Sequence, residues 1–298
     1  MLELRLTPGP GPIDVALRLT EAGHSRRLAA AIPPGHLRTL LSRWREGEGM
    51  LAPLRSIWCE FDLDSDARKL PAPVVCAKLP ASAAPTWIVD DLLPALQGHA
   101  STPERSRRVL ACIQAIHAPA RLLYVFSLRA RGSNAIRLEI LGLPPEGIRS
   151  YLRSVAPHLV APVAGAAELF AEAENIHLSY DVGDTVLPRI GVEGSFPRLP
   201  RREPRWTALF DRLVARGLCT AEKRAAALAW PGYETFWTAP AAWPVRETGV
   251  HGFCFRGLSH VKVVWRPEHR PEAKVYLSCG FSVDGQATRE DDAGGAVP

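Results

Sequence analysis

The sequence predicts an α+β protein in which ten antiparallel strands close into a β-barrel surrounded by α-helices. Pairs of alternating segments joined by short turns begin near residues 2, 57, 122, 176 and 252, and amphipathic helical segments separate the pairs. One face of each pair is apolar enough to lie under a helix, whereas the other is polar. A closed barrel would leave no exposed strand edge and would make the polar face an interior.

The five strand pairs follow from period-two alternation next to turn residues. The first flanks the turn PGPGP, and the third is joined across ARGSNA. In the last, Val261, Val263 and Val275 share one face, and Lys262 and Lys274 lie on the opposite face. The expected pairs are 2–6 with 13–19, 56–63 with 74–79, 122–129 with 136–141, 176–182 with 189–196, and the two strands within 252–281.

The helices between the pairs are predicted from apolar residues at helical spacing and from capping residues. Thr102 followed by Pro103 marks one helix start, Gly217 marks a helix end, and Thr220 caps the next helix. The short turns within each pair require antiparallel pairing and exclude a (β/α)8 barrel or a doubly wound sheet. The helical segments are expected at 37–44, 87–96, 104–116, 148–155, 166–173, 206–214 and 220–230.

Composition and charge limit the classes of function. The apolar fraction of 47% and charged fraction of 22% are typical of a globular protein, and no apolar run reaches the roughly 18 residues of a membrane span. The net charge of +5 is spread along the chain and does not indicate a nucleic-acid partner. No secretory signal is found, so we expect a cytoplasmic protein. We expect residues 1–283 to form a single domain and the polar tail, 284–298, to be disordered.

Metal sites and disulfides are not indicated by the sequence. The six cysteines lie far apart without CxxC pairing, which predicts buried thiols rather than a zinc site or a disulfide framework. Asp62, Asp64 and Asp66 imitate the start of a calcium loop, but its glycine and terminal glutamate are absent. We therefore expect no metal site built by the protein alone.

The polar faces would give a closed barrel a charged lumen. Unpaired buried charges are costly, so cations with few carboxylates predict an anionic ligand such as a diphosphate. The alternative is that these faces are an ordinary solvated side of the sheet. The inward cations would be Arg18, Lys78, Arg137, Arg189, Lys262 and Lys274, and the inward carboxylates would be Glu60, Asp62, Glu139, Asp181 and Glu193.

The chain resembles the ABBA-type enzymes, the prenyltransferase-barrel family, which have ten antiparallel strands ringed by helices in ββαα order. IWCEFDLD followed by VVCAKLP resembles the family strands that carry a catalytic glutamate and a diphosphate-binding basic residue, so the resemblance implies Glu60 as the base and Lys78 as a diphosphate ligand. RPEAKVYL is similar to a late Lys-x-Tyr strand, which implies Lys274 and Tyr276 as further ligands.

Two further motifs match the family in part. In AIRLEILG, Arg137 takes the basic place of a Lys-x-Tyr pair, but Glu139 stands where tyrosine is expected. In LSYDVGDTVLPRIGVEG, Arg189 matches an Arg-x-Lys-x-Tyr strand, whereas Gly191 and Glu193 do not. These departures remove two tyrosines that would shield an allyl cation from water.

The resemblance implies a prenyltransferase that moves a dimethylallyl or geranyl group from its diphosphate to an aromatic or ribosomal-peptide side chain. Arg137, Arg189 and Lys262 would join the diphosphate ligands above, while Trp58 and His177 would line the pocket for the carbocation and the acceptor. A hydrogen-bonded structural role for His177 remains the alternative. No cofactor is expected beyond Mg²⁺ as a counter-ion of the diphosphate. The competing hypothesis is an inactive barrel that binds a peptide or a small anion.

Overall fold

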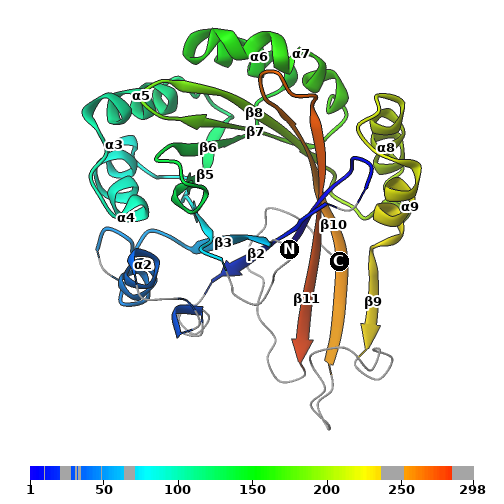
Figure 1. Ribbon diagram of the computed structural model, residues 1–298, viewed down its shortest axis with the longest axis horizontal. Helices are drawn as coiled ribbons and strands as arrows, with labels where there is room; N and C mark the ends of the chain where they lie inside the picture. Colours follow the sequence, from blue (N-terminus) through cyan, green and yellow to red (C-terminus); the bar gives the residue numbers. More distant parts are fainter. Residues whose placement is uncertain are drawn as a thin grey trace.

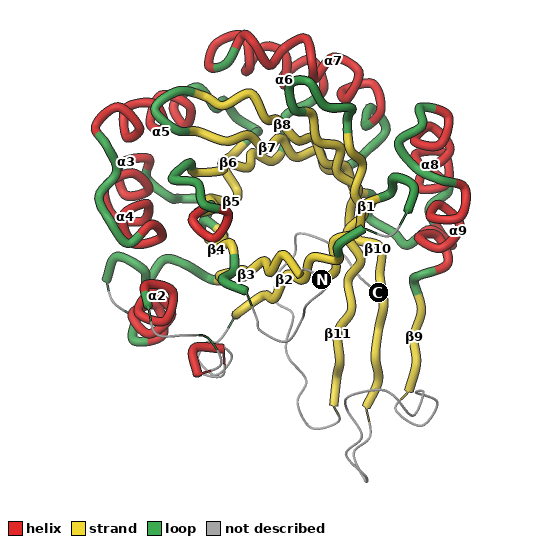
Figure 2. The backbone as a smooth tube through the Cα atoms, viewed as in Figure 1, coloured by secondary structure: helices red, strands yellow, loops and turns green. Residues whose placement is uncertain are grey.

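Ten strands form a closed antiparallel barrel in the computed structural model, which describes residues 1–9, 11–20, 28–30, 32, 35–47, 49–63, 71–235 and 252–283. The predicted disordered tail lies outside these residues. The ring runs β11-β1-β2-β3-β4-β5-β6-β7-β8-β10 and returns to β11 (Figures 1 and 2). The strands are β1 Leu2–Arg5, β2 Ile13–Leu19, β3 Ser56–Leu63, β4 Val74–Lys78, β5 Arg121–Ser127, β6 Ile136–Leu141, β7 Asn175–Val182, β8 Val186–Ser195, β9 Gly232–Thr235, β10 Gly252–Trp265 and β11 Glu272–Val283.

Helices cover the outside of this barrel (Figure 2). The predicted caps are confirmed, since the Thr102 and Thr220 side chains accept hydrogen bonds from the Arg105 and Lys223 amides. The main segments are α2 His36–Arg45, α3 Pro85–Trp87, the π-helical turn η1 Ile88–Leu92, α4 Leu93–Gln97, α5 Pro103–Gln114, α6 Pro145–Val155, α7 Val160–Leu169, α8 Arg205–Ala215 and α9 Ala221–Ala229. Short 3-10 turns are η2 Arg129–Arg131, η3 Pro157–Leu159 and η4 Pro200–Arg202.

Three local details differ from the sequence prediction. The short strand β9, which pairs with β10 at residues 253–256, was not predicted, because four residues are too few to show alternation. α7 ends at Leu169, so 170–173 are not helical. Cys279 is exposed rather than buried, because β11 pairs with β1 only as far as Leu277 and then extends past the barrel (Figure 1).

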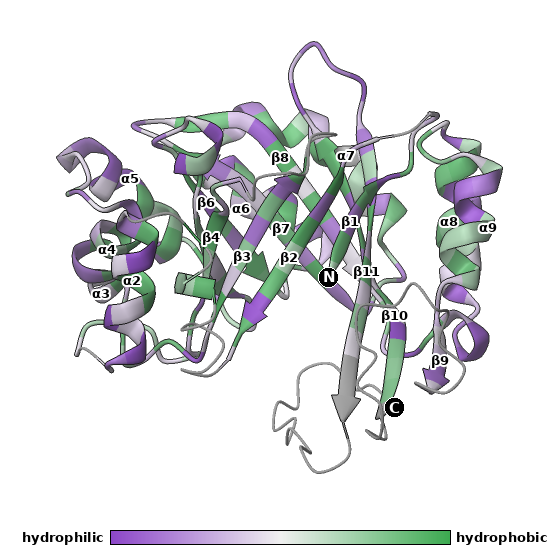
Figure 3. Ribbon diagram, turned by 60° about the horizontal axis from the view of Figure 1, so that its bottom comes forward, coloured by the Kyte–Doolittle hydropathy of each residue, from purple (hydrophilic) through white to green (hydrophobic). Residues whose placement is uncertain are grey.

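The hydrophobic core lies between the barrel and its helices. Outward side chains such as Ile57, Leu138 and Val261 are fully buried against helix residues such as Leu152 and Trp206. The strand ribbons alternate accordingly between hydrophobic and hydrophilic positions (Figure 3). Among the described residues, no helix has the length and apolar composition needed to cross a bilayer.

The polar faces of the strands point into the barrel. Most of the charged side chains there are buried rather than solvated: Lys262 is 5% exposed and Glu193 4%. Arg18 on β2 is an exception and is exposed. An open sheet face would leave such residues in water. The ordinary solvated face is therefore excluded for these strands, and the predicted lumen is confirmed.

Candidate active site in the barrel lumen

A cavity of about 350 Å³ opens at the end of the lumen where the hairpin turns lie. Both cations and carboxylates line its wall, and Tyr276 contributes a hydroxyl group. The expected scarcity of carboxylates is not observed, because Glu3 on β1 and Asp14 on β2 also point into the lumen. The cations are Arg5, Arg131, Arg137, Arg189, Arg266 and Lys274, and the carboxylates are Glu3, Asp14, Glu60, Asp62 and Asp181.

Two arginines share one carboxylate on this wall. Arg137 on β6 donates from Nε to Asp181 Oδ1 on β7 at 2.7 Å, and Arg189 Nη1 on β8 lies 3.5 Å from the same oxygen. This buried Nη1 has no hydrogen-bond partner among the described residues. Burial and the charge of Arg137 lower the pKa of Arg189 to about 10, so both guanidinium groups remain cationic at neutral pH. The group carries a net positive charge and an unused donor.

The first and last barrel strands meet in a second charged group. Lys274 and Tyr276 on β11 both donate to Glu3 on β1, so the two predicted ligands already have a partner. Burial raises the pKa of Glu3. The charge of Lys274 and the hydrogen bonds from Lys274 and Tyr276 outweigh this effect and lower the pKa of Glu3 below its usual value. Burial and the neighbouring Glu3 instead raise the pKa of Asp14 on β2 to about 7.

Glu60, the base implied by the resemblance, is bound by an arginine from a neighbouring turn. Arg131 in η2 donates from Nη2 to Glu60 Oε1 at 2.6 Å and from Nε to Asp62 Oδ2 at 2.7 Å. A proton would therefore have to compete with this guanidinium for the carboxylate. Strand alternation could not indicate this partner, because Arg131 lies in the turn after β5.

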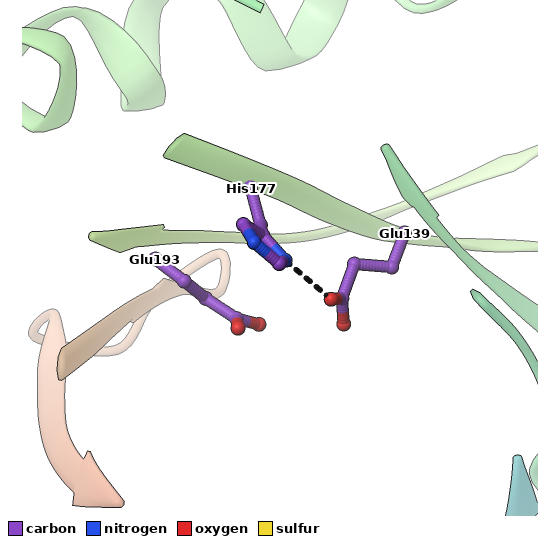
Figure 4. Close-up of side chains that lie close together, drawn as sticks. All are labelled: Glu139, His177 and Glu193. Atoms are coloured by element: carbon purple, nitrogen blue, oxygen red, sulfur yellow. Dashed lines mark hydrogen bonds and ion pairs between the residues drawn. The ribbon is translucent and has the colours of Figure 1, made fainter. Parts of the chain in front are cut away.

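Deeper in the lumen, two carboxylates flank a histidine (Figure 4). His177 Nδ1 on β7 lies 2.7 Å from Glu139 Oε1 on β6, and Glu193 on β8 lies on the other side of the imidazole. Glu193 accepts hydrogen bonds from Lys262 on β10 and lies 3.3 Å from His260 Nε2. Glu139 and Glu193 thus bind the histidine and lysine side chains of adjacent strands.

Aromatic side chains also face the lumen. Trp58 on β3 has a buried indole N–H without a partner among the described residues. Sequence patterns did not identify two further rings on β5. Tyr124 lies in register with Lys78 on β4, and Phe126 lies in register with Cys76 on β4 and with Arg137 on β6. The Arg137 guanidinium lies 5.9 Å from the Phe126 ring centroid.

Some of the predicted site residues line the cavity, and others lie elsewhere in the barrel. Arg137, Arg189, Lys274 and Tyr276 line the cavity together with Glu60. Lys262, His177 and Trp58 lie on the same polar strand faces but do not line it. Lys78 ends β4 at the opposite end of the barrel from the hairpin turns, so the structure does not bring it to the cavity.

Comparison with known proteins gave likenesses only among solved structures. No protein-family model and no curated protein matches the sequence. The chain is similar to 6-dimethylallyltryptophan synthase from Micromonospora olivasterospora in complex with DMASPP and Trp, with a TM-score of 0.48 and 14% identity over 93% of this chain and 80% of that chain. It is also similar to 5-dimethylallyltryptophan synthase from Streptomyces coelicolor, with a TM-score of 0.43 and 13% identity over 93% and 79% of the two chains.

The assignment of the fold rests on the strand order of this chain itself. Ten antiparallel strands close into a ring, their hairpins alternate with helices, and the helices lie outside. This is the ββαα barrel that the resemblance implied, and the predicted prenyltransferase-barrel fold is confirmed.

Proposed function

We propose that this protein is a prenyltransferase that moves a dimethylallyl or geranyl group from its diphosphate to an aromatic or peptide side-chain nucleophile inside the barrel. The observation that carries the proposal is the Arg137–Asp181–Arg189 group at the cavity wall. It combines an excess of positive charge with an unused buried N–H donor, a combination that a diphosphate oxygen would complete.

The chemistry follows from the charges around the cavity. As the bond between the allylic carbon and the bridging oxygen breaks, negative charge grows on the diphosphate, and Arg137, Arg189 and Lys274 stabilise it. Positive charge grows on the allylic carbon, and the faces of Trp58 and Phe126, which lie level with Arg137 along the strands, stabilise it and exclude water. An enclosed lumen strengthens both effects because water no longer screens them.

The proposed reaction needs no organic cofactor. Oxygens of Glu3, Asp14 and Glu60 lie within 4.8 Å of one another at the cavity. Lys274 and Tyr276 already donate to Glu3, and Arg131 donates to Glu60, so Mg²⁺ as the counter-ion of the diphosphate would compete with these donors for the carboxylates. Carboxylate and phosphate oxygens are the ligands that Mg²⁺ prefers.

One observation favours a second candidate, an inactive barrel that binds a peptide or a small anion. Lys262 and Lys274, two predicted diphosphate ligands, already form ion pairs with buried glutamates. A diphosphate would have to compete with those carboxylates, whereas a ligand carrying charges of both signs could join them.

The direct test is release of diphosphate. The protein is incubated with dimethylallyl and geranyl diphosphates and with a panel of tryptophan, tyrosine and peptide acceptors, and diphosphate is measured by a coupled assay. We expect release that depends on the acceptor, together with a prenylated product detected by mass spectrometry. Stabilisation by a peptide without diphosphate release from any donor would support the binding protein instead.

A further inference from the structure

The His177–Glu139 pair has the arrangement of a base and the group that orients it. A carboxylate only accepts hydrogen bonds, so the 2.7 Å contact with Glu139 fixes the Nδ1–H tautomer of neutral His177 and leaves the lone pair on Nε2. No described residue pairs with Nε2. The His177 side chain is 21% exposed, against 6% for Glu139, so the imidazole is the accessible member of the pair.

Glu139, His177 and Glu193 are poorly suited to hold a metal ion. Oxygens of Glu139 and Glu193 and a nitrogen of His177 lie within 4.8 Å of one another, which is close enough for metal ligands. However, the Lys262 ammonium already donates a hydrogen bond to the Glu193 carboxylate, and His177 Nδ1 already forms one with Glu139. A metal ion would have to displace one positive charge and break the other contact. The arrangement fits a proton on the imidazole better than a metal between the carboxylates.

Glu60 has the opposite environment. The Arg131 guanidinium forms ion pairs with the carboxylates of both Glu60 and Asp62. Glu60 is therefore held in an ion-paired group at the cavity rim. His177 has no such competitor for its free nitrogen among the described residues.

We propose that His177, oriented by Glu139, is the base that removes the proton from the acceptor, and that Glu60 is not. This inference rests on the proposed prenyl transfer. The acceptor atom attacks the allylic carbon, whose bond to the diphosphate oxygen breaks, and the diphosphate leaves with the electron pair. The proton of the alkylated acceptor atom moves to His177 Nε2, and solvent later removes it.

The position of the pair along the strands agrees with this role. Glu139 follows Arg137 by two residues on β6, a separation of about 7 Å along the strand. The diphosphate group bound at Arg137 would then lie on one side of the reacting carbon, with the base on the other. Glu139 is thus a positioning residue, and His177 is the group that touches the acceptor.

The charges around His177 also set its proton affinity. The groups that face it are Glu139 from β6, Glu193 from β8, and Lys262 and His260 from β10. Burial lowers the pKa of His177, but the hydrogen bond and charge of Glu139 and the charge of Glu193 outweigh burial and raise it above 6.5. Because the base must be neutral, turnover should rise with pH through this pKa.

The first test compares His177→Asn, Glu139→Gln and Glu60→Gln, with His99→Gln, an exposed histidine outside the barrel, as the control. We expect His177→Asn to lower kcat at least a hundredfold while the affinity for dimethylallyl thiodiphosphate, an unreactive donor analogue, stays within threefold. Glu60→Gln should retain more than a tenth of the wild-type kcat. If Glu60→Gln were inactive while His177→Asn stayed active, the assignment of His177 as the base would be wrong.

The second test is the pH profile. In Glu139→Gln the amide no longer stabilises imidazolium, so the acidic limb of the kcat profile should move to lower pH, and the His177 titration followed by NMR should move with it. An unmoved limb would remove Glu139 from this role. If the wild-type protein releases no diphosphate, the proposed reaction and the catalytic role both fail. If the wild-type protein does release diphosphate and His177→Asn has the same kcat at every pH, only the role of His177 as the base fails.

Discussion

At the scale of single residues, several charged side chains of the lumen form ion pairs with one another. Lys262 is paired with Glu193, and Lys274 with Glu3, each across two neighbouring strands of the barrel. Buried ion pairs contribute little net stability because both partners lose hydration, whereas removing one partner leaves a costly buried charge. Net stabilisation therefore does not explain these buried pairs.

Asp14 is a residue whose ionisation opposes folding. Burial and Glu3 raise its pKa to about 7 in the folded protein, above the unfolded value near 3.8. The folded state then holds the proton more tightly, so stability falls as pH rises from about 4 to about 7. Asp14→Asn removes this cost. We expect it to raise the free energy of unfolding at pH 8 by on the order of 1 kcal/mol and to change it little at pH 4.

Chemical denaturation at both pH values measures this difference. The matched control is Asp90→Asn, since Asp90 is exposed on η1 outside the barrel. Equal effects of Asp14→Asn at pH 4 and pH 8 would show that the carboxyl group titrates normally.

At the scale of elements, the strands are held in place by their contacts with the covering helices. Gly194 on β8 faces Phe170, which directly follows α7, and a Cβ atom at this position would overlap the phenyl ring. Phe170 is 1% exposed and has no room to retreat. The glycine therefore sets how closely α7 approaches the barrel.

Gly194→Ala should destabilise the protein by about 1–3 kcal/mol because it overpacks this contact. Gly165→Ala is the matched control: Gly165 lies inside α7, and the nearest atom to an added Cβ is Arg216 Nη1 at 3.8 Å. Alanine favours a helix interior, so we expect this variant to gain about 0.5–1 kcal/mol. Thermal unfolding of both variants gives the comparison, and a neutral Gly194→Ala would contradict the packing.

Sequence patterns predicted the elements well but not the contacts between them. Alternation identified the barrel strand pairs and their inward faces, because both are local properties of a hairpin. It could not show that Arg131 reaches Glu60 or that Lys262 pairs with Glu193, 69 residues away, because such contacts depend on register between separate hairpins. Lys78 was assigned to the diphosphate from a motif, but its position along β4 separates it from the cavity.

At the scale of the whole molecule, the lumen exists only because the two ends of the described chain meet. β1 lies between β2 and β11, and the contact between Lys274 and Glu3 joins residues 271 positions apart. Closure removes the free strand edges of the ring and encloses the charged faces. The site and the fold therefore depend on the same ring of strands.

We propose that an allylic diphosphate binds in this enclosed, charged lumen at the arginines that share Asp181. Isothermal titration with dimethylallyl thiodiphosphate tests it most directly, on the wild-type protein and on the Arg189→Gln and Lys78→Gln variants. We predict a single site whose affinity falls at least tenfold in Arg189→Gln and less in Lys78→Gln. Absence of binding to the wild-type protein, or equal affinity in Arg189→Gln, would contradict the account.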